Sequence, residues 1–155
     1  ILLPFLFSIT QLFGQNSLTD SQANKKSCPT NLTKKNFKTI KQFDGKVVAF
    51  DGIIEKIETS RNNTPFYKLT MGNDHHLWTV LMFENENNKT GDTIRVIGYL
   101  VPVSEPTENE KKYLDGEYMV IAFGLVDFKK SNMLFASSAS GQKQQWLDGK
   151  IPDSK

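Results

Sequence analysis

Apolar and polar residues alternate along five short stretches of the chain between about residues 46 and 128. These stretches cover residues 46–60, 66–71, 77–83, 92–101 and 117–128. A period of two is typical of strands that bury one face. The third stretch is apolar at nearly every position, as expected for a strand that is covered on both sides or faces a ligand. The pattern predicts a mainly β protein with five strands.

Two of these stretches share a glycine pattern. Gly45 and Gly91 each open a strand at a turn, and Gly52 and Gly98 follow seven residues later in the strand interiors. An interior glycine is expected where a curled strand needs a bulge or lets another backbone approach closely. Two matching curled strands predict a small closed barrel.

Short helices are expected on either side of the barrel. In residues 32–43, Phe37 and Ile40 lie three apart, and lysines occupy a different arc, which predicts an amphipathic helix packed on the barrel. Its lysine face is read as solvated, with a membrane-surface or nucleic-acid role as the alternative. In the tail, residues 129–155, a docking helix is expected over 142–148, held by Trp146 and Leu147 and stopped by glycine and proline.

The first 15 residues read as a truncated signal peptide. Residues 1–13 are almost wholly apolar, which is shorter than the roughly 20 residues that cross a bilayer, so no stable membrane span is expected. A buried N-terminal helix is the alternative. Residues 16–30 are polar and lack apolar periodicity, which predicts a flexible leader. These features favour a secreted or periplasmic protein, and a lone Cys28, which cannot form an internal disulfide in any compartment, is compatible with export.

The order of the five strands, the long bent first strand and the Gly91-Asp92 pair before the fourth strand carry a family likeness. The matching residues are Gly45, Val48, Phe50, Gly52, Ile54, Tyr67, Leu69, Gly91, Asp92, Ile94, Val96 and Gly98. Residues 41–128 resemble the OB-fold, a five-stranded Greek-key barrel that binds oligonucleotides or oligosaccharides. The likeness is nearest to tRNA-anticodon-like OB domains and to small exported bacterial OB-fold proteins. An SH3-like barrel is the structural alternative.

The charge of the barrel argues against nucleic acid as the first choice of ligand. The whole chain carries a formal charge of +2, but residues 51–127 contain 13 acidic and seven basic residues, a balance of −6. A groove that follows phosphates needs lysines and arginines beside stacking aromatic rings. Single-stranded nucleic acid is therefore the second expectation.

The sequence contains little that suggests catalysis. It has two histidines and one cysteine, and no nucleotide-binding loop or nucleophile-elbow motif is visible. In Asp74-His75-His76, adjacent side chains of an extended chain point to opposite sides, so a polar turn is preferred to a metal site. No enzymatic activity, metal or cofactor is expected.

The preferred function is a non-catalytic exported binding module. Its ligand, a protein segment, a glycan or another small molecule, is expected on a barrel face built by the first three strands. The candidate residues are Phe66, Lys68, Thr70 and Thr79 on that face, with Arg95 and Tyr99 facing outward on the fourth strand. Trp78 and Phe83 are either core or platform residues, depending on the orientation of strand 77–83. The alternatives are a single-stranded nucleic-acid-binding OB domain and a structural accessory subunit of a cell-envelope complex.

Overall fold

The structure, a computed structural model, describes residues 13–17, 27–59, 64–112 and 114–153. The expected signal peptide up to residue 12 and most of the expected leader lie outside these ranges. The strands are β1 (Phe13–Ser17), β2 (Val47–Thr59), β3 (Pro65–Gly72), β4 (His75–Leu81), β5 (Thr93–Pro102), β6 (Tyr118–Asp127) and β7 (Asn132–Ala136). The helices are the 3-10 turns η1 (Phe37–Phe43), η2 (Glu110–Lys112) and η3 (Ser137–Ala139), and the α-helix α2 (Ser140–Leu147).

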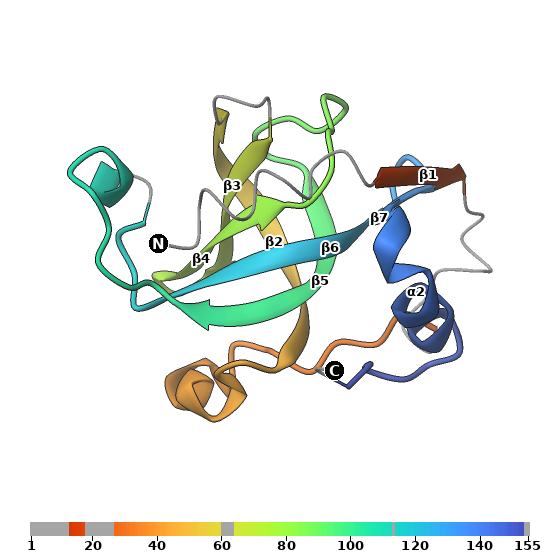
Figure 1. The fold of residues 1–155 in the computed structure, drawn as a ribbon, viewed down its shortest axis with the longest axis horizontal. Helices are drawn as coiled ribbons and strands as arrows, with labels where there is room; N and C mark the ends of the chain where they lie inside the picture. The colour runs from red at the N-terminus through yellow and green to blue at the C-terminus, as the bar shows by residue number, and fades with distance from the viewer. Residues whose placement is uncertain (1–12, 18–26, 60–63, 113, 154–155) are drawn as a thin grey trace.

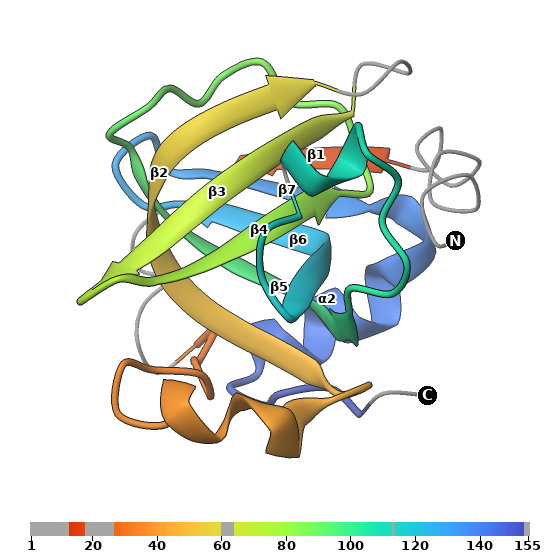
Figure 2. The same cartoon turned by 90° about the vertical axis from the view of Figure 1, so that its left-hand side faces the viewer.

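Strands β2 to β6 close into a barrel (Figures 1 and 2). The long strand β2 pairs with β5 through its first half and with β3 through its second half. β3 pairs with β4, β4 runs parallel to β6, and β6 pairs with β5 to complete the ring. The five predicted strands are each confirmed to within two residues at either end, and the predicted five-stranded Greek-key barrel is confirmed.

The glycine pattern has the steric cause that the sequence predicts. Gly45 and Gly91 adopt left-handed φ angles of 73° and 96°, which allow tight turns before β2 and β5. A Cβ atom on Gly98 would lie 2.2 Å from the carbonyl oxygen of Ile121, at a register shift between β5 and β6. The backbones of the two strands therefore meet at a position where no side chain fits.

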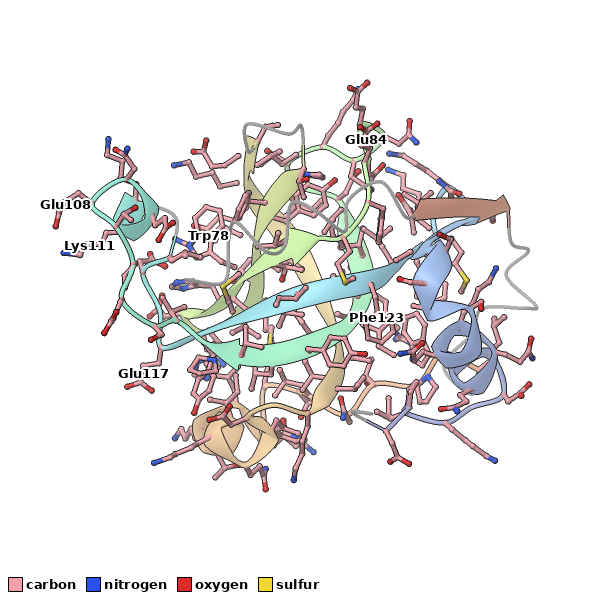
Figure 3. The ribbon with its side chains drawn as sticks, viewed as in Figure 1. Trp78, Glu84, Glu108, Lys111, Glu117 and Phe123 are labelled. Carbon is pink, nitrogen blue, oxygen red and sulfur yellow. The ribbon has the colours of Figure 1, made fainter. Side chains whose placement is uncertain are left out.

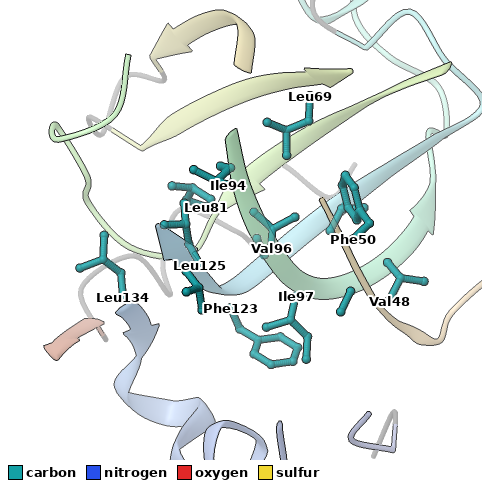
Figure 4. Close-up of a cluster of buried hydrophobic side chains, with 14 of the residues drawn as sticks. Val48, Phe50, Leu69, Leu81, Ile94, Val96, Ile97, Phe123, Leu125 and Leu134 are labelled. Atoms are coloured by element: carbon teal, nitrogen blue, oxygen red, sulfur yellow. The ribbon is translucent and has the colours of Figure 1, made fainter. Parts of the chain in front are cut away.

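The barrel interior is filled by apolar side chains from all five strands (Figure 4). They include Val48 and Phe50 of β2, Leu69 of β3, Leu81 of β4, Ile94 and Val96 of β5, and Leu125 of β6. Each of these seven side chains is at most 1% exposed. Alternation along the strands directs them to the same side, because successive residues of a strand point to opposite faces.

A second layer covers the outer side of β5 and β6. β7 pairs with β6 and was not predicted, whereas α2 confirms the helix expected at residues 142–148. Trp146 of α2 is fully buried, and its Nε1 donates a hydrogen bond of 2.8 Å to the carbonyl oxygen of Pro29. The backbone N–H of Cys28 in turn donates to the carbonyl oxygen of Trp146 at 2.7 Å. Cys28 and Pro29, which precede the barrel, are thus hydrogen-bonded to Trp146, which follows it.

The N-terminal elements differ from the expectation. Residues 13–17, expected at the boundary between signal peptide and flexible leader, form β1, which pairs with β7. The helix expected within residues 32–43 is only a 3-10 turn, η1. Its beginning is limited by Asn36, whose side chain accepts a hydrogen bond from the backbone of Thr33 and donates to the carbonyl oxygen of Asn31. These bonds favour a turn over helical pairing.

Arg95 points away from the barrel interior, as expected, but its side chain is covered and bonded within the chain, which leaves little of this candidate binding residue exposed to a ligand. Its side chain is 7% exposed and makes two hydrogen bonds to Asp51, of 2.6 and 2.8 Å. A third N–H group donates to the carbonyl oxygen of Cys28 at 2.9 Å, and the guanidinium lies 5.0 Å from the ring centre of Phe128. Arg95 therefore holds the second layer to the barrel.

Replacement of Gly98 tests the close approach between β5 and β6. We expect Gly98→Ala to lower the free energy of unfolding by about 3 kcal/mol or more, because the backbone of Ile121 cannot move without breaking the ladder. Gly141→Ala is the matched control, since a Cβ there meets no atom within 4 Å. In helix α2 it should raise stability by up to about 1 kcal/mol. Urea unfolding measures both, and equal effects would contradict the packing argument.

Arg95→Ala should lower the free energy of unfolding by about 3 kcal/mol. This lies at the lower end of the range for removing one partner of a buried ion pair, because Asp51 is half exposed. Arg95→Lys should recover only part of this loss, since an ammonium group cannot reproduce the two parallel bonds. The exposed Lys150→Ala serves as the control and should change stability by less than about 0.5 kcal/mol. A wild-type unfolding midpoint for Arg95→Ala would show that the buried cation is dispensable.

Candidate binding face on strands β3 and β4

The orientation of β4 decides which residues face outward. Phe66, Lys68 and Thr70 of β3 lie on the outer side, directly opposite Val80, Trp78 and His76 of β4. The other residues of these strands point into the barrel, including Tyr67 and Leu69. The open question about strand 77–83 is thereby answered: Trp78 lies on the outer face and Phe83, 1% exposed, belongs to the core.

An open depression of about 520 Å³ lies on this outer face. It is lined by Glu55, Lys68, Thr70, Asn73, Asp74 and His76. The lining side chains come from β2, β3, β4 and the turn between the last two. Two predicted residues, Lys68 and Thr70, are therefore brought together at an accessible surface.

Lys68 is the central charged group of the depression. Its side chain is 21% exposed, and its Nζ lies 3.8 Å from Glu55 and 3.9 Å from Asp115. The hydroxyl group of Thr70 is already engaged within its own turn, since its Oγ1 accepts a hydrogen bond from the backbone N–H of Gly72. Lys68 therefore sits between two carboxylates on a rigid strand, with part of its surface open to a ligand.

Three other predicted residues are not accessible. Thr79 is fully buried inside the barrel, and within the described part of the chain its Oγ1 has no hydrogen-bond partner. Phe66 is on the outer face but is only 5% exposed. Tyr99 is half-buried beneath α2, where its hydroxyl accepts a hydrogen bond of 3.2 Å from Gln142. Alternation predicts the side of the strand correctly for Phe66 and Tyr99, but it does not show that other segments cover them.

The segment that covers Phe66 is the connection between β5 and β6, residues 103–117, which we call the strap. Figure 2 shows it crossing in front of β4 and β6, and Figure 3 shows Trp78 on the side of the sheet that faces it. Leu114 of the strap is 7% exposed and completes an outer apolar cluster. The barrel contributes the rest of this cluster, namely Phe66, Trp78, Val80, Met119 and Ile121.

Asp115, the next strap residue, is bound by side chains of β4. Its Oδ1 accepts a hydrogen bond of 2.9 Å from Nε1 of Trp78 and lies 3.1 Å from Nε2 of His76. Burial raises the pKa of the Asp115 carboxyl, but the hydrogen bonds from His76 and Trp78 and the charge of Lys68 outweigh it and hold the pKa below its usual range. The sequence offered no periodic signal for Leu114 or Asp115, because they lie in an irregular charged loop.

The two histidines do not act together. His75 stacks on the ring of Phe37, with 4.5 Å between the ring centres, while His76 faces Asp115. Within the described residues, no three His, Cys, Asp or Glu side chains are grouped so that they could hold a metal ion. The same described residues include no helix with the length and apolar character required to cross a membrane.

The contact between Asp115 and β4 should depend on pH. Folding lowers the pKa of Asp115, so its contact with β4 stabilises the position of the strap at pH values above 3.8, the ordinary pKa of aspartate. The contact is lost as the pH falls through the lowered pKa. We expect the indole N–H resonance of Trp78 to shift below about pH 4 in ¹⁵N-resolved NMR spectra. The indole of Trp146, bonded to a backbone carbonyl, is the internal control. A Trp78 shift that persists unchanged in Asp115→Asn would contradict the assignment.

Comparison with known proteins supports the fold. No protein-family model and no curated protein matches the chain. An aspartyl-tRNA synthetase from Entamoeba histolytica gives a TM-score of 0.46 at 10% identity, over 64% of this chain and 21% of that chain. An asparaginyl-tRNA synthetase from the same organism gives 0.40 at 17% identity, over 53% and 20%. A chain assigned as an aspartyl-tRNA synthetase from Leishmania major Friedlin gives 0.51 at 12% identity, over 81% and 25%.

The present chain thus spans about a quarter or less of each of these proteins. At such low identity the likeness concerns the fold alone. The Leishmania match covers most of the described barrel, and the strand order closes through β6 and β5 as in a five-stranded Greek-key barrel. The chain is therefore an OB-fold protein.

Proposed function

We propose that this protein is a non-catalytic binding module whose ligand lies in the depression beside Lys68. The observation that carries this proposal is the arrangement of Lys68 between Glu55 and Asp115 on the rigid outer face of the barrel. A group that enters the depression can replace one of these carboxylates without any movement of the backbone. The ligand is a protein segment, a glycan or another small polar molecule.

The chemistry of the depression favours binding over catalysis. Among the described residues that line it, no cysteine or serine lies beside a base, and the only lining histidine, His76, already faces Asp115. Nucleophilic catalysis needs a nucleophile and a base within hydrogen-bonding distance of each other. The remaining polar groups are suited to orienting a ligand.

The charges around the depression disfavour a polyanionic ligand. Glu55 and Asp74 line it and Asp115 adjoins it, so three carboxylates stand against the one ammonium group of Lys68. This excess repels a phosphate backbone, which needs several cations along its path. A glycan hydroxyl or a peptide amide can instead bond to both the ammonium group and the carboxylates.

Export remains part of the proposal. It rests on the apolar residues 1–13 followed by polar residues, a pattern typical of secretory signal peptides. An extracytoplasmic location agrees with a ligand such as a glycan or a segment of another envelope protein.

Single-stranded nucleic acid is the second candidate. The observation in its favour is the shared fold with a chain assigned as an aspartyl-tRNA synthetase, whose named substrate is a tRNA. Against it, the aromatic rings of Phe66 and Trp78, which could stack on bases, are covered by the strap.

Two binding measurements test the function. We expect arrays of glycans and peptides to yield a ligand whose affinity falls about tenfold in Lys68→Ala, because a hydrogen bond to a charged group is lost. The affinity should be unchanged in Lys150→Ala, which removes an equal charge from an exposed position in the C-terminal tail.

Fluorescence anisotropy with labelled single-stranded DNA and RNA at two salt concentrations provides the second measurement. We expect no binding at low salt. Tight, salt-sensitive binding that weakens in Lys68→Ala would replace the proposed function by the nucleic-acid alternative. The absence of any array ligand would remove the support for a binding module.

A further inference from the structure

The barrel presents a preformed apolar surface to the strap. Five of the six residues in the outer apolar cluster belong to strands β3, β4 and β6, and only Leu114 comes from the strap. The two large rings, Phe66 and Trp78, are 5% and 3% exposed with the strap in place. An apolar group of this size is normally found either in a core or at an interaction site.

Beside this surface, the barrel presents hydrogen-bond donors that meet at one point. Trp78 and His76 of β4 direct ring nitrogens to Asp115, and Lys68 of β3 lies 3.9 Å from the same carboxylate. The donors stand on paired strands, whereas the carboxylate belongs to an irregular connection. The rigid side of the contact is thus complementary to a large apolar residue followed directly by a carboxylate.

The strap is a small unit with its own internal bonds. At its base the backbone N–H of Val103 donates to the carbonyl oxygen of Glu117. Within it, Thr107 and Glu110 bond reciprocally around the start of η2, and Lys111 pairs with Glu108. Leu114 belongs to this unit, because its backbone N–H donates to the carbonyl oxygen of Glu110 at 2.8 Å. We therefore expect Leu114 and Asp115 to leave the barrel face together with η2.

We propose that the strap occupies, within its own chain, a recognition site for a protein partner that presents a large apolar residue followed directly by aspartate or glutamate. This inference rests on the proposed binding function and commits it to a peptide ligand. Leu114 and Asp115 act as an internal competitor, so a partner segment binds only the fraction of molecules in which the strap is displaced. The apparent affinity is reduced in proportion to that fraction.

A peptide copied from the strap tests this proposal. The labelled probe has the sequence of residues 110–117, Glu-Lys-Lys-Tyr-Leu-Asp-Gly-Glu. It is titrated by fluorescence anisotropy against the full chain and against the double variant Leu114→Ser, Asp115→Ser, whose strap cannot compete. We expect the double variant to bind the probe at least about tenfold more tightly than the wild type, as removal of an effective internal competitor requires.

Matched controls separate recognition from nonspecific opening. The variant Glu108→Ala, Lys111→Ala alters two exposed strap residues that form an ion pair with each other, and it should bind like the wild type. A second peptide with alanine and asparagine in place of its leucine and aspartate should not bind. Equal binding of both peptides, or no binding of the probe to a folded double variant, would overturn the proposal.

If the double variant does not fold, Asp115→Asn provides the test, because it keeps Leu114 and removes only the charge. We expect the probe to bind it severalfold more tightly than the wild type and to shift the Trp78 indole resonance. No shift at a saturating probe concentration would overturn the proposal. Concentration-dependent dimers of the wild type that disappear in a strap variant would assign the site to a second copy of this chain instead of a partner.

The outcome of the strap-peptide titration can be distinguished from the outcome of the array experiment that tests the proposed function. An array ligand that depends on Lys68 but contains no apolar-acidic pair would keep the binding function and exclude this ligand class. Conversely, the probe titration reads the strap site directly and does not depend on finding an array ligand.

Discussion

The guanidinium of Arg95 joins four parts of the chain that are far apart in sequence. It bonds to Asp51 of β2 and to the backbone of Cys28, lies against Phe128, and is itself carried by β5. Burial of a cation is costly unless its donors are satisfied, so the geometry of these groups is tightly constrained. With residues 27–32 held in this way, the outer side of β5 is closed, and β3 and β4 carry the accessible face of the barrel.

The two covered outer faces are held by different means. β7 is joined to β6 by a strand ladder, and the fully buried Trp146 packs against Phe135 of β7. The strap contributes one buried apolar side chain, Leu114, one partly buried side chain, Val103, and one half-exposed carboxylate to its contact with the barrel. Local opening costs least where few buried contacts must be broken. The binding proposals therefore concern the strap side of the barrel, where a small change in contacts uncovers aromatic surface.

Sequence reasoning located the barrel strands because alternation and turn glycines are local signals. It also placed Lys68 and Thr70 on the accessible face. It gave the correct side of the strand for Arg95 and Phe66 but not their burial, since a period of two tells which residues leave the barrel interior and not which ones reach solvent. Arg95 is covered by the segment around Cys28 and by Phe128, and Phe66 is covered by an irregular loop, the strap. Their positions depend on long-range contacts that no local pattern contains.

The hydrogen bond between Trp146 and Pro29 spans 117 positions of the chain. Contacts of such high sequence separation form late and slow the folding of small proteins, because a long loop must close before any energy is gained. During synthesis the partners of Arg95 are all present once Phe128 has been added, whereas the two bonds to Trp146 wait for helix α2. The segment before the barrel therefore receives its last hydrogen bonds only after residue 146 has left the ribosome.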